Sequence, residues 1–420
     1  MLSARHARPR ENCATGAVDR HDLLLRAAIQ RTRRGRGAVA PPGAMIRSLR
    51  ALHLVCDCLR TDAAGHLQRL RKIDDTTWSY AIALANEHLV GPALHAALER
   101  TGRLADIPDA VRDYLALLHQ SNAARNDCLR QQALELIGAL GNAGVDALLL
   151  KGGATLLSAP APSARMIRDL DLLVPRHAAD RVFTTLDNLG YRAIARYPAG
   201  HHAYGDFARP GEPGAVDLHF ELIDTPHVLP AQDVWRRADQ IVVQGRRFFV
   251  PSPTDRVLHN VLHAQVHFLA NYYRGAFELR QLHEFASFTR DDAPGVDWTF
   301  VAGSLTRHRL RTPLHAYALL AHRLLDAPWK LPGAPAVAAR LQVQRCLLQH
   351  RVPALAGWGT PLANVQSAFA PHRMAGLYGQ QSPLLQRRLH HASRFLRKRD
   401  AGDWIARLLR SEAHPRGWRR

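Results

Sequence analysis

Lysine is nearly absent from this chain of 420 residues: four residues are lysine, and the other 52 basic residues are arginine. Cysteine is also scarce, with five scattered residues, an odd number that lacks the spacing of a zinc or redox motif. We therefore expect no disulfide framework and place the chain in a reducing cytoplasm. No apolar run approaches the roughly 18 residues of a membrane-spanning helix, so the sequence predicts no transmembrane segment.

The formal charge of +20 is concentrated at the two ends of the chain. Residues 1–44 hold nine arginines against three acids, and residues 381–420 hold eleven basic residues against three acids, so these ends contribute +6 and +8. A polyanionic partner and a plain solvated basic surface both stay open. For the basic C-terminal region we consider nucleic acid, an acidic protein or a membrane surface as partners, besides a solvated helix face.

Composition and periodicity divide the chain into five expected segments: 1–44, 45–144, 145–251, 252–326 and 327–420. The first is rich in Arg, Gly and Pro, and we expect a disordered basic segment or a mis-assigned start ahead of Met45. The second and fourth have apolar residues at helical spacing, and the last is helical and basic. Only the third alternates between strand and helix patterns. This order predicts an α+β protein, with a small mixed-sheet core between helical regions.

The central segment carries two acids on one predicted strand. Residues 165–174 form a predicted strand that carries Asp169 and Asp171. Because side chains alternate along a strand, both acids project from one face while the opposite face is apolar. Two carboxylates this close disfavour double ionisation unless a cation neutralises them, and their hard oxygens suit Mg²⁺ or Mn²⁺.

A lysine and two glycines follow the preceding apolar run at residues 145–150. Gly152 and Gly153 let the backbone approach a ligand closely, and a helix beginning at Ala154 would point free N–H groups at an anion. Lys151 adds a positive charge at the same place. This pattern predicts a phosphate site.

A later strand supplies a candidate third acid. Residues 215–223 alternate cleanly, with Asp217, His219 and Glu221 on the polar face, although an ordinary solvent-facing stripe would have the same pattern. Beyond an N-cap and proline at Ser252-Pro253, a predicted helix places His259, His263 and His267 at intervals of four. Zinc could bind such a row, but no matching cysteine or acid accompanies it, so we favour packed histidines.

These motifs, in their order and spacing over residues 148–285, resemble the uncharacterised nucleotidyltransferase family of the polymerase-beta-like nucleotidyltransferase superfamily. The segments that carry the resemblance are Lys151-Gly152-Gly153, Arg165, Asp169-Leu170-Asp171-Leu172-Leu173-Val174 and Val216-Asp217-Leu218-His219-Phe220. Many relatives have an aromatic residue between the glycines and the arginine, where this chain has Ser158-Ala159-Pro160-Ala161-Pro162.

The resemblance implies a nucleotidyltransferase core and a metal-dependent transfer of a nucleoside monophosphate from a nucleoside triphosphate. It assigns Asp169, Asp171 and Asp217 to catalysis and to Mg²⁺ or Mn²⁺, Lys151, Gly152, Gly153 and Arg165 to the nucleotide, and His219 to a possible substrate contact. The acceptor is unidentified, and a link to polysaccharide biosynthesis is expected. The alternatives are an inactive nucleotide- or RNA-binding interaction module and a toxin-like enzyme that modifies tRNA.

Overall fold

The computed structural model describes residues 42–60, 70–157, 163–198, 201–267, 270–293, 295–379 and 381–397. Their contacts group them into two compact units. Within the described ranges, unit 1 consists of residues 70–220 and 239–250, and unit 2 of residues 42–60, 221–238 and 251–397. The five segments expected from the sequence stay a prediction.

Unit 1 is built on a seven-stranded mixed sheet with the order β3-β4-β5-β2-β1-β7-β6. β2 pairs with β5 and β1 pairs with β7 in parallel, while the other neighbours are antiparallel. The strands are β1 (Leu148–Leu149), β2 (Asp169–Leu173), β3 (Arg192–Arg196), β4 (Ala203–Ala208), β5 (Ala215–His219), β6 (Asp239–Val243) and β7 (Arg246–Val250). The predicted α+β class, a mixed sheet flanked by helices, is confirmed.

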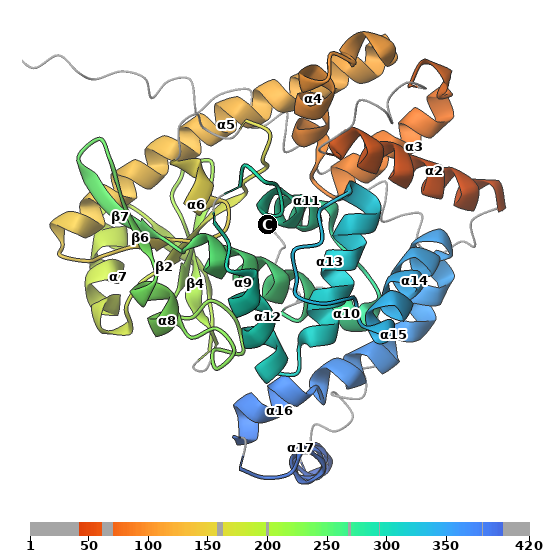
Figure 1. Cartoon of the computed structure of the whole chain (residues 1–420). Coiled ribbons are helices and arrows are strands. Elements are labelled where there is room, and N and C mark those ends of the chain that lie inside the picture. Colours follow the sequence, from red (N-terminus) through yellow and green to blue (C-terminus); the bar gives the residue numbers. More distant parts are fainter. Residues whose placement is uncertain are drawn as a thin grey trace, which may run out of the picture. The chain divides into compact units, whose positions relative to one another are not determined.

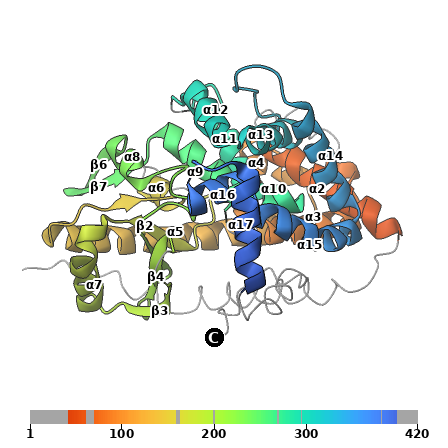
Figure 2. The same ribbon diagram turned by 90° about the horizontal axis from the view of Figure 1, so that it is seen from below.

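The helices of unit 1 are α3 (Asp75–Glu87), α4 (Gly91–Arg100), η2 (Leu104–Asp106), α5 (Asp109–Asn142), α6 (Gly153–Leu156), η3 (Arg176–Ala178) and α7 (Ala179–Asn188). Buried side chains of α5, α6 and α7 cover the apolar face of the sheet, whereas α4 packs on α5 and α3 packs on α4. The long helix α5 runs alongside the strands (Figures 1 and 2). Leucines of its C-terminal half and the buried side of α7 form one core with the sheet. This packing leaves the opposite face of the sheet for polar side chains.

The alternation predicted for the acid-bearing strand is present. Leu170, Leu172 and Val174 belong to the core that α5 and α7 cover, and so do Val216 and Leu218 of the neighbouring strand β5. The residues between them therefore project from the other face of the sheet, because side chains alternate along a strand. The apolar face thus fixes the direction of the acids on β2 and β5.

The sheet differs from the sequence prediction around the glycine turn. β1 has two residues rather than a run over 145–150, and the chain turns away after it at Lys151, which has a φ of 47°. The expected helix at Ala154 is a single turn, α6, that starts at Gly153. The hairpin of β6 and β7 was not predicted; its two turn residues, Gln244 and Gly245, both have positive φ.

Gly205 holds a strained position in β4 that only glycine fits. Its φ is 153°, and a Cβ there would lie 2.2 Å from the backbone oxygen of Ala195 in β3. We expect Gly205→Ala to lower the free energy of unfolding of unit 1 by about 3 kcal/mol, because a backbone atom cannot move aside as a side chain can. Urea unfolding followed by circular dichroism measures this loss, and amide hydrogen exchange in β4 assigns it to unit 1.

Gly141 in α5 provides the matched control within the same unit. A Cβ at this helical position has no neighbour within 4 Å among the described residues. Gly141→Ala should therefore leave the stability unchanged or raise it by up to about 1 kcal/mol. A wild-type urea midpoint for Gly205→Ala would contradict the steric argument.

The regular secondary structure in the described part of unit 2 consists of helices. Its helices are α2 (Pro42–Leu59), α8 (Ala231–Arg236), α9 (Pro253–Gln265), α10 (Asn271–Arg274), α11 (Leu279–Phe288), α12 (Trp298–Arg307), α13 (Arg311–Leu325), α14 (Val337–Arg351), α15 (Pro353–Ala368), α16 (Pro371–Tyr378) and α17 (Leu384–Arg397). Ser252 caps α9 as predicted, because its side chain accepts a hydrogen bond from the Asp255 N–H. Among the described helices, none combines the length and the hydropathy of a membrane span.

Parts of the expected termini lie outside the described residues. Helix α2 begins at Pro42, three residues ahead of Met45, whereas residues 1–41 and the basic residues 398–420 are not among those described. The prediction of a basic docking region at the C-terminus therefore stays a prediction.

Three of the described cysteines are free thiols. Cys56, Cys58 and Cys346 are all buried. Burial raises the pKa of the Cys56 and Cys58 thiols, which agrees with inert packing rather than redox chemistry. The cytoplasmic location stays a prediction.

Candidate active site

Three carboxylates lie side by side across neighbouring strands on the polar face of the sheet in unit 1. Asp171 of β2 is the register partner of Asp217 in β5, and Asp217 is in turn the partner of Asp206 in β4. Register partners on adjacent strands project from the same face about 5 Å apart. We call Asp206, Asp217 and Asp171 the acid row.

Two basic side chains contact the acid row at its β2 end. The Nζ atom of Lys151 donates a hydrogen bond to Oδ1 of Asp171 over 2.6 Å. Nε2 of His219 lies 2.9 Å from Oδ2 of Asp217 and 3.3 Å from Oδ1 of Asp171. Asp171 and His219 are 2% and 1% exposed, so these contacts form in a setting where charge is weakly screened.

The charges of these groups depend on one another. Burial disfavours the charged forms, yet the charge of Lys151 and the hydrogen bond from His219 hold the pKa of Asp171 below its usual range. Burial would lower the pKa of His219, but Asp217 and Asp171 raise it to about 9. Burial would likewise lower the pKa of Lys151, but Asp171, Asp217 and Asp169 raise it. These directions favour an ionised Asp171 that faces an ammonium group and an imidazolium group.

Asp169, the other acid of the predicted pair, lies two residues before Asp171 in β2 and is partly exposed. Its pKa is raised, first by burial and then by the charge of Asp171. It is not part of the compact metal-binding group described below. The two acids of the sequence motif therefore differ in environment, although they share a face of the strand.

The lysine-glycine turn lies at the same end of the acid row. Gly152 and Gly153 are packed against the chain itself: an added Cβ would lie 3.0 Å from the side chain of Ile167 and 3.3 Å from that of Leu149, respectively. Close packing alone therefore explains why glycine is found at these two positions, without a bound ligand. The Nε atom of Arg165 lies 3.5 Å from the Cβ position at Gly152, so the structure brings Arg165 to this turn as well.

The donor set fits a divalent cation. Ligand atoms of Asp171, Asp217 and His219 all lie within 4.8 Å of one another, and this is the one such group of His, Cys, Asp or Glu among the described residues. Within the same part of the chain, Oδ1 of Asp217 is buried without a hydrogen-bond partner. A carboxylate oxygen in that state is costly unless a cation or donor meets it. The two carboxylates can hold a hard cation by themselves, whereas His219 would first have to lose its proton.

Sequence reasoning missed Asp206 and its partner Tyr197. Asp206 is 8% exposed, and the Tyr197 hydroxyl donates a hydrogen bond to its Oδ2 over 3.0 Å. Burial and the charge of Asp217 raise the pKa of Asp206 to about 6. The sequence does show a single acid, Asp206, in a strand without other charged residues. That Asp206 lies beside Asp217 depends on the register between β4 and β5, which the sequence does not reveal.

Three residues of α5, also missed, anchor the segment that leads into β2. Arg125 donates hydrogen bonds to the carbonyl oxygens of Ile167, Arg168 and Pro213. Asn122 and Asn126 donate to the carbonyl oxygen of Arg165 over 3.0 and 2.9 Å. These bonds satisfy the backbone of an irregular segment, and they position the start of the acid-bearing strand.

Two histidines of the α9 row contact polar side chains of unit 2, and the predicted packing against the catalytic core stays a prediction. Nδ1 of His263 lies 2.6 Å from Nε2 of Gln281, and Nδ1 of His267 lies 3.0 Å from Oδ1 of Asp224, all within unit 2. The described part of the chain has no metal-binding group at these histidines.

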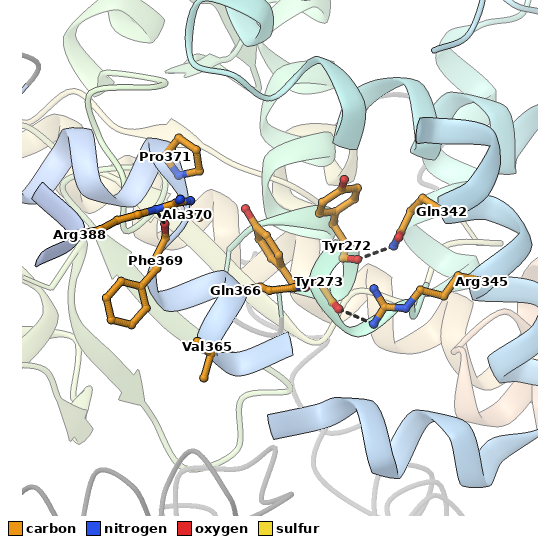
Figure 3. A pocket seen from close by; sticks show the side chains of 10 residues that line it. All are labelled: Tyr272, Tyr273, Gln342, Arg345, Val365, Gln366, Phe369, Ala370, Pro371 and Arg388. Carbon is orange, nitrogen blue, oxygen red and sulfur yellow. Dashed lines mark hydrogen bonds between the residues drawn. The ribbon is translucent and has the colours of Figure 1, made fainter. Parts of the chain in front are cut away.

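A pocket of about 580 Å³ in unit 2 is chemically different from the acid row (Figure 3). Its lining residues are Tyr272, Tyr273, Gln342, Arg345, Val365, Gln366, Phe369, Ala370, Pro371 and Arg388. Arg345 and Gln342 point at backbone carbonyl oxygens of the two tyrosines, to which they donate hydrogen bonds (Figure 3). With no acid in its lining, this pocket offers no carboxylate to a metal ion.

The comparison with known proteins agrees with this geometry. The uncharacterised nucleotidyltransferase family matches residues 74–326, so the chain belongs to that family, and the resemblance seen in the sequence is confirmed. No curated protein and no solved structure matches the chain. Membership in this family supports a transferase activity in general terms, together with the candidate metal-binding group of Asp171, Asp217 and His219.

Proposed function

We propose that this protein transfers a nucleoside monophosphate from a nucleoside triphosphate to an acceptor, with the help of Mg²⁺ or Mn²⁺. The observation that carries the proposal is the pairing of Asp171 with Asp217 on adjacent parallel strands, with an unpartnered buried oxygen of Asp217 beside them. Family membership supports the reaction class. A bound divalent cation would supply charge neutralisation for the triphosphate and for the pyrophosphate that leaves.

The proposed roles follow from position. Asp169, Asp171 and Asp217 are the candidate catalytic and metal-binding acids. Lys151, which contacts Asp171, offers its ammonium group to the phosphates, and Arg165 lies at the same turn. The backbone of Gly152 and Gly153 borders that place. His219, buried between two acids, orients them and is the candidate substrate contact.

Catalysis in this arrangement is mainly a matter of position and charge. The lysine-glycine turn would bind the triphosphate, and Asp171 and Asp217 would hold the cation that attracts its α-phosphate to the polar face of the sheet. The acceptor is unidentified, and the expected link to polysaccharide biosynthesis stays a prediction. A binding module without turnover is the alternative that the following experiment separates.

The test is incubation of the purified full-length protein with each of the four α-labelled nucleoside triphosphates, a cell extract and Mg²⁺ or Mn²⁺. We expect one nucleotide to give a labelled product and an equal amount of pyrophosphate, and both to disappear when EDTA removes the metal. Nucleotide binding without labelling or pyrophosphate release would instead identify an inactive module. Labelling that persists in EDTA would contradict the metal requirement.

A further inference from the structure

The acid row extends one strand beyond the acids that the sequence motifs supply. Asp206 is the β4 partner of Asp217, is 8% exposed, and faces the same side of the sheet as Asp217. A buried carboxylate next to another carboxylate is unfavourable, and of its described contacts the Tyr197 hydroxyl is the one that donates to it. A hydroxyl bond leaves a carboxylate with further acceptor positions.

The acid row has opposite character at its two ends. At the β2 end, Lys151 and the glycine turn form the positive part of the site, which suits phosphates. At the β4 end, Asp206 and Tyr197 offer a carboxylate and a phenol. Two strand spacings, about 10 Å, separate Asp206 from Asp171, so the two ends can hold different parts of a reacting pair.

Transfer of a nucleoside monophosphate needs this separation. The attacking oxygen and the leaving pyrophosphate lie on opposite sides of the α-phosphorus in an in-line displacement. With pyrophosphate at the Lys151 end, the attacking group approaches from the other end of the row. A carboxylate at that end can accept a proton and repels phosphates.

We infer that Asp206 receives the proton of an acceptor hydroxyl group, and that Tyr197 is a positioning residue for Asp206; this inference rests on the proposed function. As the hydroxyl proton moves to the Asp206 carboxylate, the acceptor oxygen forms a bond to the α-phosphorus. The bond from that phosphorus to the bridging oxygen breaks, and its electron pair leaves with pyrophosphate. Asp206 then returns the proton to solvent.

Tyr197 also offers a surface to the rest of the acceptor. Tyr197 is 37% exposed, and its ring stacks on His201, with ring centroids 4.2 Å apart. A sugar or base ring can pack against an aromatic face of this kind. The acceptor class is therefore a molecule with a hydroxyl group on or next to a ring.

The test compares Asp206→Asn with Asp217→Asn in the full-length protein. Mn²⁺ binding is measured by electron paramagnetic resonance, and labelled product is measured over a range of nucleotide concentrations with the same extract. We expect Asp206→Asn to keep Mn²⁺ binding and the KM for the nucleotide within about threefold, while kcat falls at least about 100-fold. Asp217→Asn should lose Mn²⁺ binding as well. Asp187→Asn, which removes an exposed acid paired with Arg192, serves as the matched control with wild-type kinetics.

Tyr197→Phe keeps the ring and removes the hydroxyl, so it tests the same inference without a change in a buried charge. We expect kcat to fall about tenfold at unchanged KM. Wild-type kcat in either Asp206→Asn or Tyr197→Phe would overturn the inference, and so would loss of Mn²⁺ binding in Asp206→Asn, because Asp206 would then be a metal ligand. If Asp206→Asn does not fold, an unchanged kcat in Tyr197→Phe overturns it alone. Wild-type protein without product from any nucleotide would overturn the proposed function and this inference together.

Discussion

Asp171→Asn is expected to reduce transfer by a factor on the order of 1000, the largest effect of any single substitution in this site. The carboxylate at this position contacts Lys151, faces Asp217 in register and lies within reach of His219. An amide keeps the shape but removes the charge that a cation and these basic groups require. The rate of labelled product formation, measured alongside Mn²⁺ binding, gives both consequences.

The same substitution should also cost stability, because it removes the carboxylate that Lys151 contacts and one of the two carboxylates beside the buried His219. The expected loss is about 3 kcal/mol, so circular dichroism must first establish that the variant is folded. Asp217→Asn, at a more exposed side chain, repeats the activity test if it is not. Asp146→Asn, at an exposed acid paired with Arg247 beside the same sheet, should leave activity unchanged. Full transfer by folded Asp171→Asn would remove the metal site from the mechanism.

Lys151→Met is expected to lower kcat/KM for the nucleotide by about 100-fold, mainly through a higher KM. The ammonium group is the cationic side chain that contacts the acid row from the glycine turn, and the phosphates lose it in this variant. Lys151 also has a φ of 47°, an uncommon conformation for a residue with a side chain, and such strain tends to persist at functional sites. Initial rates at several nucleotide concentrations separate the KM and kcat effects.

Lys330→Met provides a closely matched control. Lys330 binds Asp291 over 2.8 Å, and its side chain is 32% exposed against 29% for Lys151, but its partner is at the surface and belongs to unit 2. The control should therefore retain wild-type kinetics. Equal KM values for Lys151→Met and the wild type would exclude the phosphate role and leave Lys151 as a structural partner of Asp171.

The fold was most predictable where the pattern is local. The acid-bearing strand and the strand with Asp217 alternate between apolar and polar residues, and both lie in the sheet with the predicted face inward. The N-cap at Ser252 was equally clear, since capping involves residues three apart. These features are encoded within a few positions of the chain.

Features that depend on distant partners were not predictable in the same way. The β6–β7 hairpin turns through Gln244-Gly245 rather than the stronger Asn-Gly signal, and β7 then pairs with β1 about a hundred residues earlier. Asp206 joins the acid row only through the register of β4 on β5, which shifts near Gly205. Neither register nor bulge has a local signature in this sequence.

The candidate site shows the same division. Sequence alternation predicted that Asp169 and Asp171 share a face, and the strand pairing supplied Asp217 next to Asp171. Alternation did not predict that Asp171 is deeply buried while Asp169 is partly exposed, because burial depends on what packs around each end of the strand. The assignment of Asp169, Asp171 and Asp217 to catalysis stays a prediction until the variants are measured.

Arg125, Asn122 and Asn126 of helix α5 hold the segment before β2 in place. Activity should therefore depend on residues outside the acid row. Helix α5 bears no reacting group, yet its side chains set where the acid-bearing strand begins. Random mutagenesis that selects for lost activity should therefore recover substitutions on this helix as well as among the acids. In relatives that keep the motif acids but lose these amide and guanidinium donors, we expect the acids to be present but no longer held in the positions that catalysis needs.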